Sequence, residues 1–413
     1  MRLAVLGTDP ETIQLALAAN SAGHEIAWLG DIRPEDEARV RQIDSPDSTS
    51  GDWELLLDQA TADAVLVGRG TARADLREEQ LKRLVAASVP LLVVHPTGHS
   101  VLTYYELDMT RRESHDILRH FNPLVGHPTI PTMVNWIDNG HETIGTLHQI
   151  ACQREIASKS RADVLHWLAR DSELLAAIAG NIRHVSAVGP RDTAASYSSL
   201  QVQLTTPRLP SLRWSVVPSS GASKGELQFV GEKGTITVRI PADSADGPRA
   251  GWQVDTVVAG EQRHESLPPF DAPRLAIEQL ATAVAEPDSE RRSAASTWPA
   301  ATQSMEVVDA VELSLQKGRT IEVHQQQLTE QLAFRGTMAA LGCGLLLVVF
   351  AAVVLAGLAG IFESKERDRL IPQWPILLLA ALAFFLLLQV VPLLATMRKA
   401  TKTPPGPTSN KAE

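Results

Sequence analysis

The sequence predicts an α/β protein with a doubly wound sheet, then an α+β domain with an open, mostly antiparallel sheet, then two transmembrane helices. Three observations predict this organisation. Short apolar runs alternate with helical patterns from Met1 to Pro96, which is typical of a parallel sheet. From His184 onward apolar and polar residues alternate, which is typical of β-strands. Finally, Thr337–Phe362 and Ile371–Met397 contain no charged residue.

The first thirty residues have the layout of a dinucleotide-binding βαβ unit. Leu3–Leu6 is a buried-strand pattern that Gly7 interrupts, and Asp9 is a candidate N-cap for a helix beginning at Pro10. A second strand, Glu25–Leu29, follows the helix. Strand, glycine turn, helix, strand and a following acid, Asp31, is the order found in such units.

The glycine fingerprint of this unit is altered. Aligned on Gly7, the three glycine positions of G-x-G-x-x-G hold Gly7, Asp9 and Thr12. The layout therefore predicts the fold more strongly than it predicts the ligand.

Two further strands, Ala64–Gly68 and Pro90–Val94, flank a helix at Arg77–Ala87. Ligands in doubly wound sheets lie beyond the carboxyl ends of the strands. This rule places His95 on the same rim as the candidate cofactor-binding residues, which are Gly7, Thr8, Asp9, Thr12, Asp31, Gly68, Arg69 and Thr71.

The middle of the chain returns to helices and then changes to strands. Tyr104–Phe121 is predicted to be helical, as is Arg161–Gly180, which Gly180 ends. The segments VSAVG, SLQVQLTT, LRWSVVP, ELQFVG, GTITVRI and WQVDTVV are strand candidates, with a hairpin turn at Gly231–Gly234. Helices are expected again at Ala276–Ala285 and Ala300–Lys317, the second ending at Gly318.

Several of these segments resemble the Gfo/Idh/MocA family of NAD(P)-dependent oxidoreductases over about four fifths of the chain, Met1–His324. They are the N-terminal unit, LRWSVVP, GEKGTITV and SMEVVDAVELSLQKGRTIEV. The resemblance implies a Rossmann-like domain (residues 1–124) and an α+β domain (125–328) whose open sheet could form a homo-oligomer. It also implies NAD or NADP as cofactor and a sugar or polyol-like hydroxyl as substrate.

The resemblance also implies catalytic positions, and this sequence departs from the family at each. The lysine of the family's Glu-Lys-Pro motif corresponds to His95, which is either a general acid–base group or the filler of a strand end. In LHWLARDSELL, the family's aspartate and histidine correspond to His166 and Arg170. Arginine remains protonated, so Arg170 cannot be a general base but could bind an anion. A solvated helix face is the alternative.

The two acids of the N-terminal unit have alternative roles as well. Asp9 either tolerates a cofactor in an altered pose or caps the helix by occupying the amides that a pyrophosphate would use. Asp31 either accepts hydrogen bonds from the adenosine ribose, which favours NAD over NADP, or serves the turn before Arg33.

Composition excludes several other classes of function. The net charge is −10 and the pI about 5.7, without a basic block, so no nucleic-acid partner is expected. Cys152 and Cys343 form neither a metal-ligand spacing nor a disulfide framework, which suits a reducing compartment. No histidine spacing predicts a metal site, and the N-terminus lacks a signal-peptide pattern.

The two uncharged segments are each long enough to span a bilayer, which takes about 20 residues. A short loop, residues 363–370, joins them, so we expect a transmembrane hairpin over residues 335–400 in contact with the lipid bilayer, followed by a disordered tail over 401–413. Four Lys and Arg flank the hairpin outside the loop and three lie in it. This margin favours a two-pass protein with the soluble part and both termini in the cytoplasm.

Two functions therefore remain open from the sequence. The first is a membrane-anchored oxidoreductase that transfers a hydride between NAD(H) and a sugar or polyol-like hydroxyl. The second is a non-catalytic, membrane-tethered protein that binds a small-molecule ligand or scaffolds partners on the same fold.

Overall fold

The computed structural model describes residues 1–323, apart from residues 44–51, 59, 99, 115, 192–195, 210 and 243–249. Its contacts divide the chain into Met1–Gln325 and Gln326–Glu413. Within the described residues, no helix combines the length and the apolar character that crossing a membrane requires. The predicted hairpin (335–400) and tail (401–413) lie outside the described residues.

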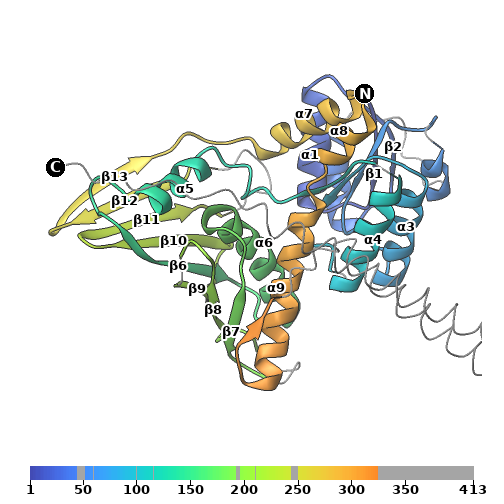
Figure 1. The fold of residues 1–413 in the computed structure, drawn as a ribbon. Coiled ribbons are helices and arrows are strands. Elements are labelled where there is room, and N and C mark those ends of the chain that lie inside the picture. Colours follow the sequence, from blue (N-terminus) through green and yellow to red (C-terminus); the bar gives the residue numbers. More distant parts are fainter. Residues whose placement is uncertain are drawn as a thin grey trace, which may run out of the picture. The chain divides into compact units, whose positions relative to one another are not determined.

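A parallel five-stranded sheet forms the N-terminal part, and its strand order is β2-β1-β3-β4-β5 (Figure 1). The strands are β1 (Arg2–Leu6), β2 (Glu25–Gly30), β3 (Ala64–Val67), β4 (Leu91–Val94) and β5 (Leu118–Phe121). The chain winds one way from β1 to β2 and the other way from β3 to β4. The prediction of a doubly wound sheet is confirmed, and its switch point lies between β1 and β3, where a ligand crevice is expected.

Alternating side chains of β1 serve the two faces of this sheet. Leu3 and Val5 pack in an apolar cluster with α1 (Pro10–Ser21), whereas Ala4 and Leu6 pack in another with α3 (Ala74–Ala86) and α4 (Val101–Ser114). Short helical turns fill the connection after β2: η1 (Pro34–Asp36), α2 (Glu37–Val40) and η2 (Trp53–Leu57).

The helix predicted over Tyr104–Phe121 is too long. Helix α4 ends at Ser114, and Leu118–Phe121 pairs as a strand with β4, with Leu118 opposite Leu91. Pairing with a buried neighbouring strand satisfies the backbone at the sheet edge, and this tertiary contact overrides the local pattern.

The second sheet has nine strands in the order β13-β12-β11-β10-β6-β9-β8-β7-β14. All pairings are antiparallel except that of β6 with β9, so the predicted mostly antiparallel sheet is confirmed. The hairpin at Gly231–Gly234 is also confirmed, because Val230 pairs with Thr235. The strands are β6 (Leu147–Ile156), β7 (His184–Val188), β8 (Gln201–Thr205), β9 (Leu212–Pro218), β10 (Lys224–Gly231), β11 (Gly234–Ile240), β12 (Gln253–Val258), β13 (Glu261–Ser266) and β14 (Ile321–Glu322).

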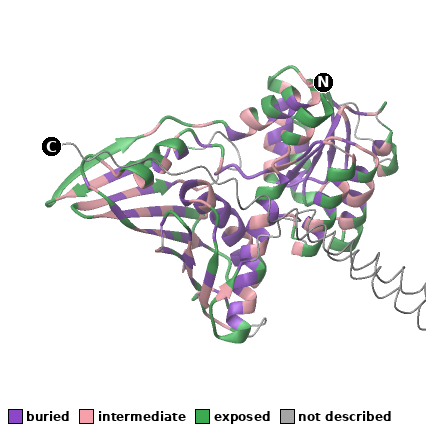
Figure 2. Ribbon diagram, viewed as in Figure 1, coloured by how far each residue is buried: buried purple, intermediate pink, exposed green. Residues whose placement is uncertain are grey.

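Helices cover one face of this sheet and leave the other polar. The core of the sheet packs against α6 (Arg161–Ala179) and α9 (Trp298–Lys317), and α5 (Ile130–Asn139) packs on α6. Buried residues alternate with partly buried or exposed ones along β6 and its neighbours (Figure 2). Gly318 ends α9 with φ 64°, a left-handed conformation that suits glycine, as the sequence predicts.

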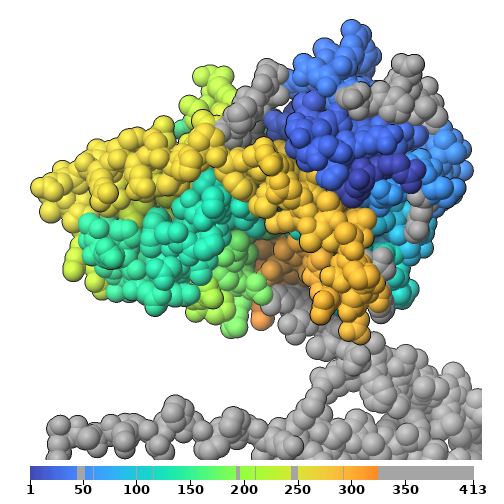
Figure 3. Space-filling model, turned by 90° about the horizontal axis from the view of Figure 1, so that it is seen from above, coloured from blue at the N-terminus to red at the C-terminus, as the bar shows by residue number. Residues whose placement is uncertain are grey.

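After the second sheet the chain returns to the first one. Helices α7 (Ala272–Ala285) and α8 (Ser289–Ala294) precede α9, and α7 lies against the N-terminal residues (Figure 3). Ile277 and Leu280 are buried in the same cluster as Ile13 and Ala16 of α1. The face of the first sheet that carries α1 is therefore completed by residues more than 250 positions away.

Candidate functional site

The glycines after β1 and β3 meet at the switch point. Gly7 has φ 82°, a conformation that an L side chain rarely adopts, and a Cβ there would lie 2.9 Å from the carbonyl oxygen of Gly68. A Cβ on Gly68 would lie 2.5 Å from the carbonyl oxygen of Gly7. The two glycines thus allow the two turns to touch each other.

Asp9 occupies the amino end of α1. Its Oδ1 accepts hydrogen bonds from the backbone N–H of Glu11 (3.0 Å), the N–H of Thr12 (2.8 Å) and the Thr12 hydroxyl (2.9 Å). Its Oδ2 accepts the backbone N–H of Arg69 at 3.0 Å. Asp9 is therefore the N-cap, and its carboxylate holds the donors that a dinucleotide-binding helix offers to a pyrophosphate.

Asp31 is held by the loop after β3. Its carboxylate accepts the backbone N–H of Thr71 at 2.8 Å and the Thr71 hydroxyl, and it pairs with Arg77 of α3. Burial alone would raise the pKa of Asp31, but the hydrogen bonds from Thr71 and the charge of Arg77 bring it below its usual value. Asp31 is therefore ionised, and its carboxylate is already bonded to Thr71 and Arg77. The loop that carries Arg69 and Thr71 is tied to α1 by Asp9 and to β2 by Asp31.

His95 follows β4 and is 1% exposed. Its Nδ1 lies 3.1 Å from the Tyr104 hydroxyl, and its Nε2 lies 2.8 Å from Oγ of Ser304. The Ser304 hydroxyl donates to the carbonyl of Ala301, and the Tyr104 hydroxyl accepts the N–H of Thr97. The consistent arrangement is a neutral imidazole that donates from Nε2 to Ser304 and accepts at Nδ1 from Tyr104. Burial lowers the pKa of His95 to about 3.

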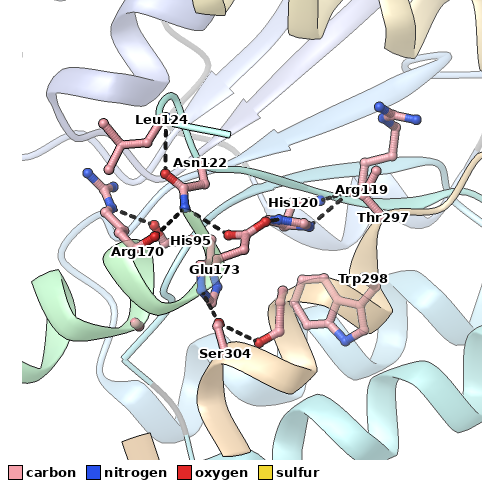
Figure 4. A network of polar contacts seen from close by, with 12 residues as sticks. His95, Arg119, His120, Asn122, Leu124, Arg170, Glu173, Thr297, Trp298 and Ser304 are labelled. Atoms are coloured by element: carbon pink, nitrogen blue, oxygen red, sulfur yellow. Dashed lines mark hydrogen bonds and ion pairs between the residues drawn. The ribbon is translucent and has the colours of Figure 1, made fainter. Parts of the chain in front are cut away.

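A buried network surrounds His95 (Figure 4). His120 Nε2 lies 2.5 Å from Glu173 Oε1, and the Asn122 side-chain amide donates to Glu173 Oε2 at 2.8 Å. Thr297 Oγ1 lies 2.9 Å from His120 Nδ1. Burial would raise the pKa of Glu173, but His120, His95 and Asn122 together lower it. The network joins β5, α6 and the start of α9.

Arg170 connects α6 to the amino end of α1. Its guanidinium forms an ion pair with the Glu11 carboxylate, with Nη1 2.6 Å from Oε1, and its Nε donates to the carbonyl of His95 at 2.9 Å. Arg170 is buried. The positive charge of Arg170 is therefore balanced by the carboxylate of Glu11.

His166 lies one helical turn before Arg170, at the wall of a cleft. Nη2 of Arg69 is 2.7 Å from Nδ1 and 2.9 Å from Nε2 of His166. Burial, followed by the charges of Arg170 and Arg69, holds the pKa of His166 well below its usual value. The cleft has a volume of about 490 Å³, which is in the range of small-molecule sites. It lies between the segment that follows His95, the first turns of α6 and the middle of α9.

The predicted site residues thus separate into two groups. Asp9, Asp31, Thr12 and the loop from Gly68 to Thr71 lie together at the switch point, but they bind one another, and Thr8, Asp9 and Thr12 are buried. The Asp9 carboxylate occupies the N–H groups of α1 at which the diphosphate of NAD or NADP is expected to bind. His166 and Arg69 instead line the cleft, and the catalytic roles of His95, His166 and Arg170 remain predictions.

Sequence reasoning missed several members of the network. His120 was one of several dispersed histidines, and nothing in the local pattern distinguished it or Tyr104, Asn122 and Ser304. Arg77, within a predicted helix, carried no signal either. It is buried beside Gly7, and among the described residues its Nε and Nη1 have no hydrogen-bond partner. Among the described residues, no group of three His, Cys, Asp or Glu is arranged to hold a metal ion.

Comparison with known proteins gives a fold and no closer relative. No protein-family model matches the chain, and no curated protein matches it by sequence. Solved structures do match. An oxidoreductase from Agrobacterium radiobacter in complex with NAD+, L-tartaric acid and magnesium shares 14% identity with a TM-score of 0.57, covering 78% of this chain and 98% of that one.

Two further structures give the same result. A 3-ketoreductase from Actinomadura kijaniata, in complex with NADP and TDP-benzene, shares 18% identity with a TM-score of 0.60 (76% and 97% covered). A putative myo-inositol dehydrogenase from Sinorhizobium meliloti shares 16% with a TM-score of 0.55 (78% and 100% covered). The chain shares the fold of these oxidoreductases and dehydrogenases. At these identities the likeness concerns the fold alone, and it confirms the Rossmann-like first domain and the second sheet.

Proposed function

We propose that this chain is a small-molecule-binding protein on the fold of NAD(P)-dependent oxidoreductases, with the cleft beside Arg69 and His166 as its binding site and without hydride transfer. The observation that carries this proposal is the state of His95, which takes the position of the family's catalytic lysine. Both of its ring nitrogens have internal partners, and it is closed off from solvent.

Acid–base catalysis requires a group that reaches the substrate and has a pKa near the working pH. His95 has a pKa of about 3, and its two ring nitrogens are hydrogen-bonded to Tyr104 and Ser304. Arg170 is protonated throughout and is held by Glu11. Neither group supplies the proton transfer that oxidation of a hydroxyl requires.

The second candidate is an NAD(P)-dependent oxidoreductase acting on a sugar or polyol hydroxyl. The NAD+ and NADP in the matched structures support it, as do the turn at Gly7 and the position of Asp31 after β2. In this candidate the switch-point residues line the cofactor, and His95, His166 and Arg170 serve the substrate. Asp9 must first release the amides of α1.

Cofactor titration of the full-length protein in detergent separates the two candidates. We expect no change in NADH or NADPH fluorescence at micromolar cofactor and at most a weak thermal shift at millimolar cofactor. Replacing Asp9 by Gly frees the α1 amides and should strengthen binding. Asp271→Gly, which removes the equivalent cap of α7, is the matched control and should not. Tight binding by the unaltered chain, with turnover of a polyol, would establish the oxidoreductase instead.

We also propose that residues 335–400 anchor the protein in a membrane, with the body in the cytoplasm, and that the second sheet pairs two copies. The absence of charge from both apolar segments supports the anchor. Alkaline extraction should leave the full chain in the membrane fraction, and a single cysteine placed in the 363–370 loop should be labelled only from outside the cell. Release by alkali would contradict the anchor.

A further inference from the structure

Both apolar and charged side chains line the cleft beside His166. The apolar ones include Val101, Leu165 and Val308. Arg69 and His166 also line it. Three acids, Asp163, Asp309 and Glu312, line it as well; Asp163 accepts hydrogen bonds from the hydroxyls of Ser158 and Ser160, and Glu312 is paired with Arg161.

Arg69 differs from the other arginines around the switch point. Arg33 is paired with Asp36, Arg77 with Asp31 and Arg170 with Glu11. In the part of the chain that the structure describes, the Arg69 guanidinium has no carboxylate within ion-pair distance, and its polar contact is the imidazole of His166.

That imidazole leaves most of the guanidinium unused. A neutral imidazole has one acceptor nitrogen, whereas a guanidinium has five N–H donors in a planar fork. The cleft walls, and then the nearby Arg170 cation, lower the pKa of Arg69, but arginine stays charged at any working pH. A cation whose guanidinium keeps donors that no described residue uses thus faces a cavity large enough for a small metabolite.

We propose that the cleft binds a small molecule carrying an oxyanion, a carboxylate or a phosphate, which the Arg69 fork holds while the rest of the ligand lies along Val101, Leu165 and Val308. The inference rests on the cleft being the binding site proposed above, and it names the class of ligand. Fork-shaped donors match the two oxygens of such groups, and low-polarity walls strengthen the attraction.

The test uses the full-length protein and calorimetric titration at low salt. The probes are matched six-carbon compounds: an uncharged polyol, its carboxylic acid and its phosphate ester, with inorganic phosphate as a fourth. We expect one of the charged compounds to bind more tightly than the polyol. The acid and the ester distinguish a carboxylate ligand from a phosphate ligand.

Variants connect the binding to Arg69. Arg69→Gln should weaken the charged ligand about tenfold or more, the range of a lost charged hydrogen bond. Arg69→Lys, which keeps the charge and loses the fork, should be intermediate. Arg73→Gln removes an exposed arginine four residues away and should change nothing. Thermal unfolding checks that each variant is folded, and the backbone N–H of Arg69 that binds Asp9 is retained in all of them.

Three results would overturn the inference. One is equal binding of polyol and acid, and another is an unchanged dissociation constant for the Arg69→Gln variant. The third is loss of NADH binding in that variant with no binding of any small acid, which would assign Arg69 to the nucleotide. Oxidation of a probe by NAD would refute the non-catalytic proposal alone and leave the oxyanion site intact.

Discussion

His95 illustrates how the surroundings of a titratable side chain decide what it can do. A lysine at the end of β4 would extend a permanent charge, whereas the imidazole is accommodated between Tyr104 and Ser304 as a neutral hydrogen-bonding group. The desolvation that makes this possible is also what removes its proton. The residue holds β4, α4 and α9 together.

This state of His95 predicts a pH dependence of stability. Its pKa is about 3 in the folded protein and 6.5 in a free chain, so below 6.5 the unfolded chain binds a proton that the folded one does not. Its contribution is complete above pH 6.5 and is lost as the pH falls toward 3, at about 1.4 kcal/mol per pH unit within that window. Charges facing His95 are those of Glu173, Arg170 and His120.

Urea unfolding between pH 4 and 7 measures this slope. Replacing His95 by Gln should flatten it, and the exposed His148→Gln should leave it unchanged. His166 contributes to the slope in both variants, because its pKa is lowered as well. An equal slope in the His95→Gln variant would mean that the imidazole is solvated.

At the scale of elements, a buried ion pair fixes α6 on the second sheet. Arg154 of β6 is 1% exposed and Asp171 of α6 is 0% exposed. Nε of Arg154 donates to Asp171 at 3.0 Å, and the indole N–H of Trp214 on β9 donates to the same carboxylate at 2.8 Å. One carboxylate thus joins a helix to two neighbouring strands.

Removing that carboxylate should be costly. Asp171→Ala leaves the Arg154 cation buried beside an empty space, and we expect a loss of about 3–5 kcal/mol in the free energy of unfolding, measured in urea. Glu278→Gln, which breaks the exposed pair with Arg274, should change the free energy of unfolding far less, because solvent screens that pair. Similar losses in the two variants would show that water reaches Asp171.

At the scale of the whole molecule, the core of the first sheet includes residues from far along the chain. Residues 1–124 contain all strands of the first sheet, but α7 supplies Ile277 and Leu280 to the cluster around α1. A fragment of residues 1–124 would expose that face to water, at about 25 cal/mol for each Å² of apolar area.

We therefore expect residues 1–124 alone to unfold at lower urea concentration than the same sheet in the full chain, or to aggregate. Far-UV circular dichroism and urea titration measure this. A peptide of residues 271–286 should restore part of the stability, and the same peptide with Ile277 and Leu280 replaced by Ser should not. A fragment as stable as the full chain would disprove the dependence on α7.

The sequence predicted the elements whose pattern is local and missed those that depend on distant partners. The unbroken apolar runs of β1, β3 and β4 can be recognised in the sequence itself, and so can the glycines that end α6 and α9. Strand β5 was not, because only β4 makes it a strand, nor was β6, which lies at the centre of the second sheet. Within the site, Asp9 was placed as a possible cap from its spacing. The partners of His95, however, come from 9 and 209 residues away, which no spacing encodes.

The cap at the amino end of α1 amounts to an intramolecular competitor. The Asp9 carboxylate belongs to the same chain as the amides it binds, so its effective concentration at those amides is high and constant. Any anion from solution must displace it in order to bind there. A cap is worth about 0.5–2 kcal/mol, which alone weakens an incoming diphosphate by about 2- to 30-fold, before charge repulsion is added. A single carboxylate at this turn thus lowers the affinity of the α1 amides for an external anion, while the fold that surrounds it stays the same.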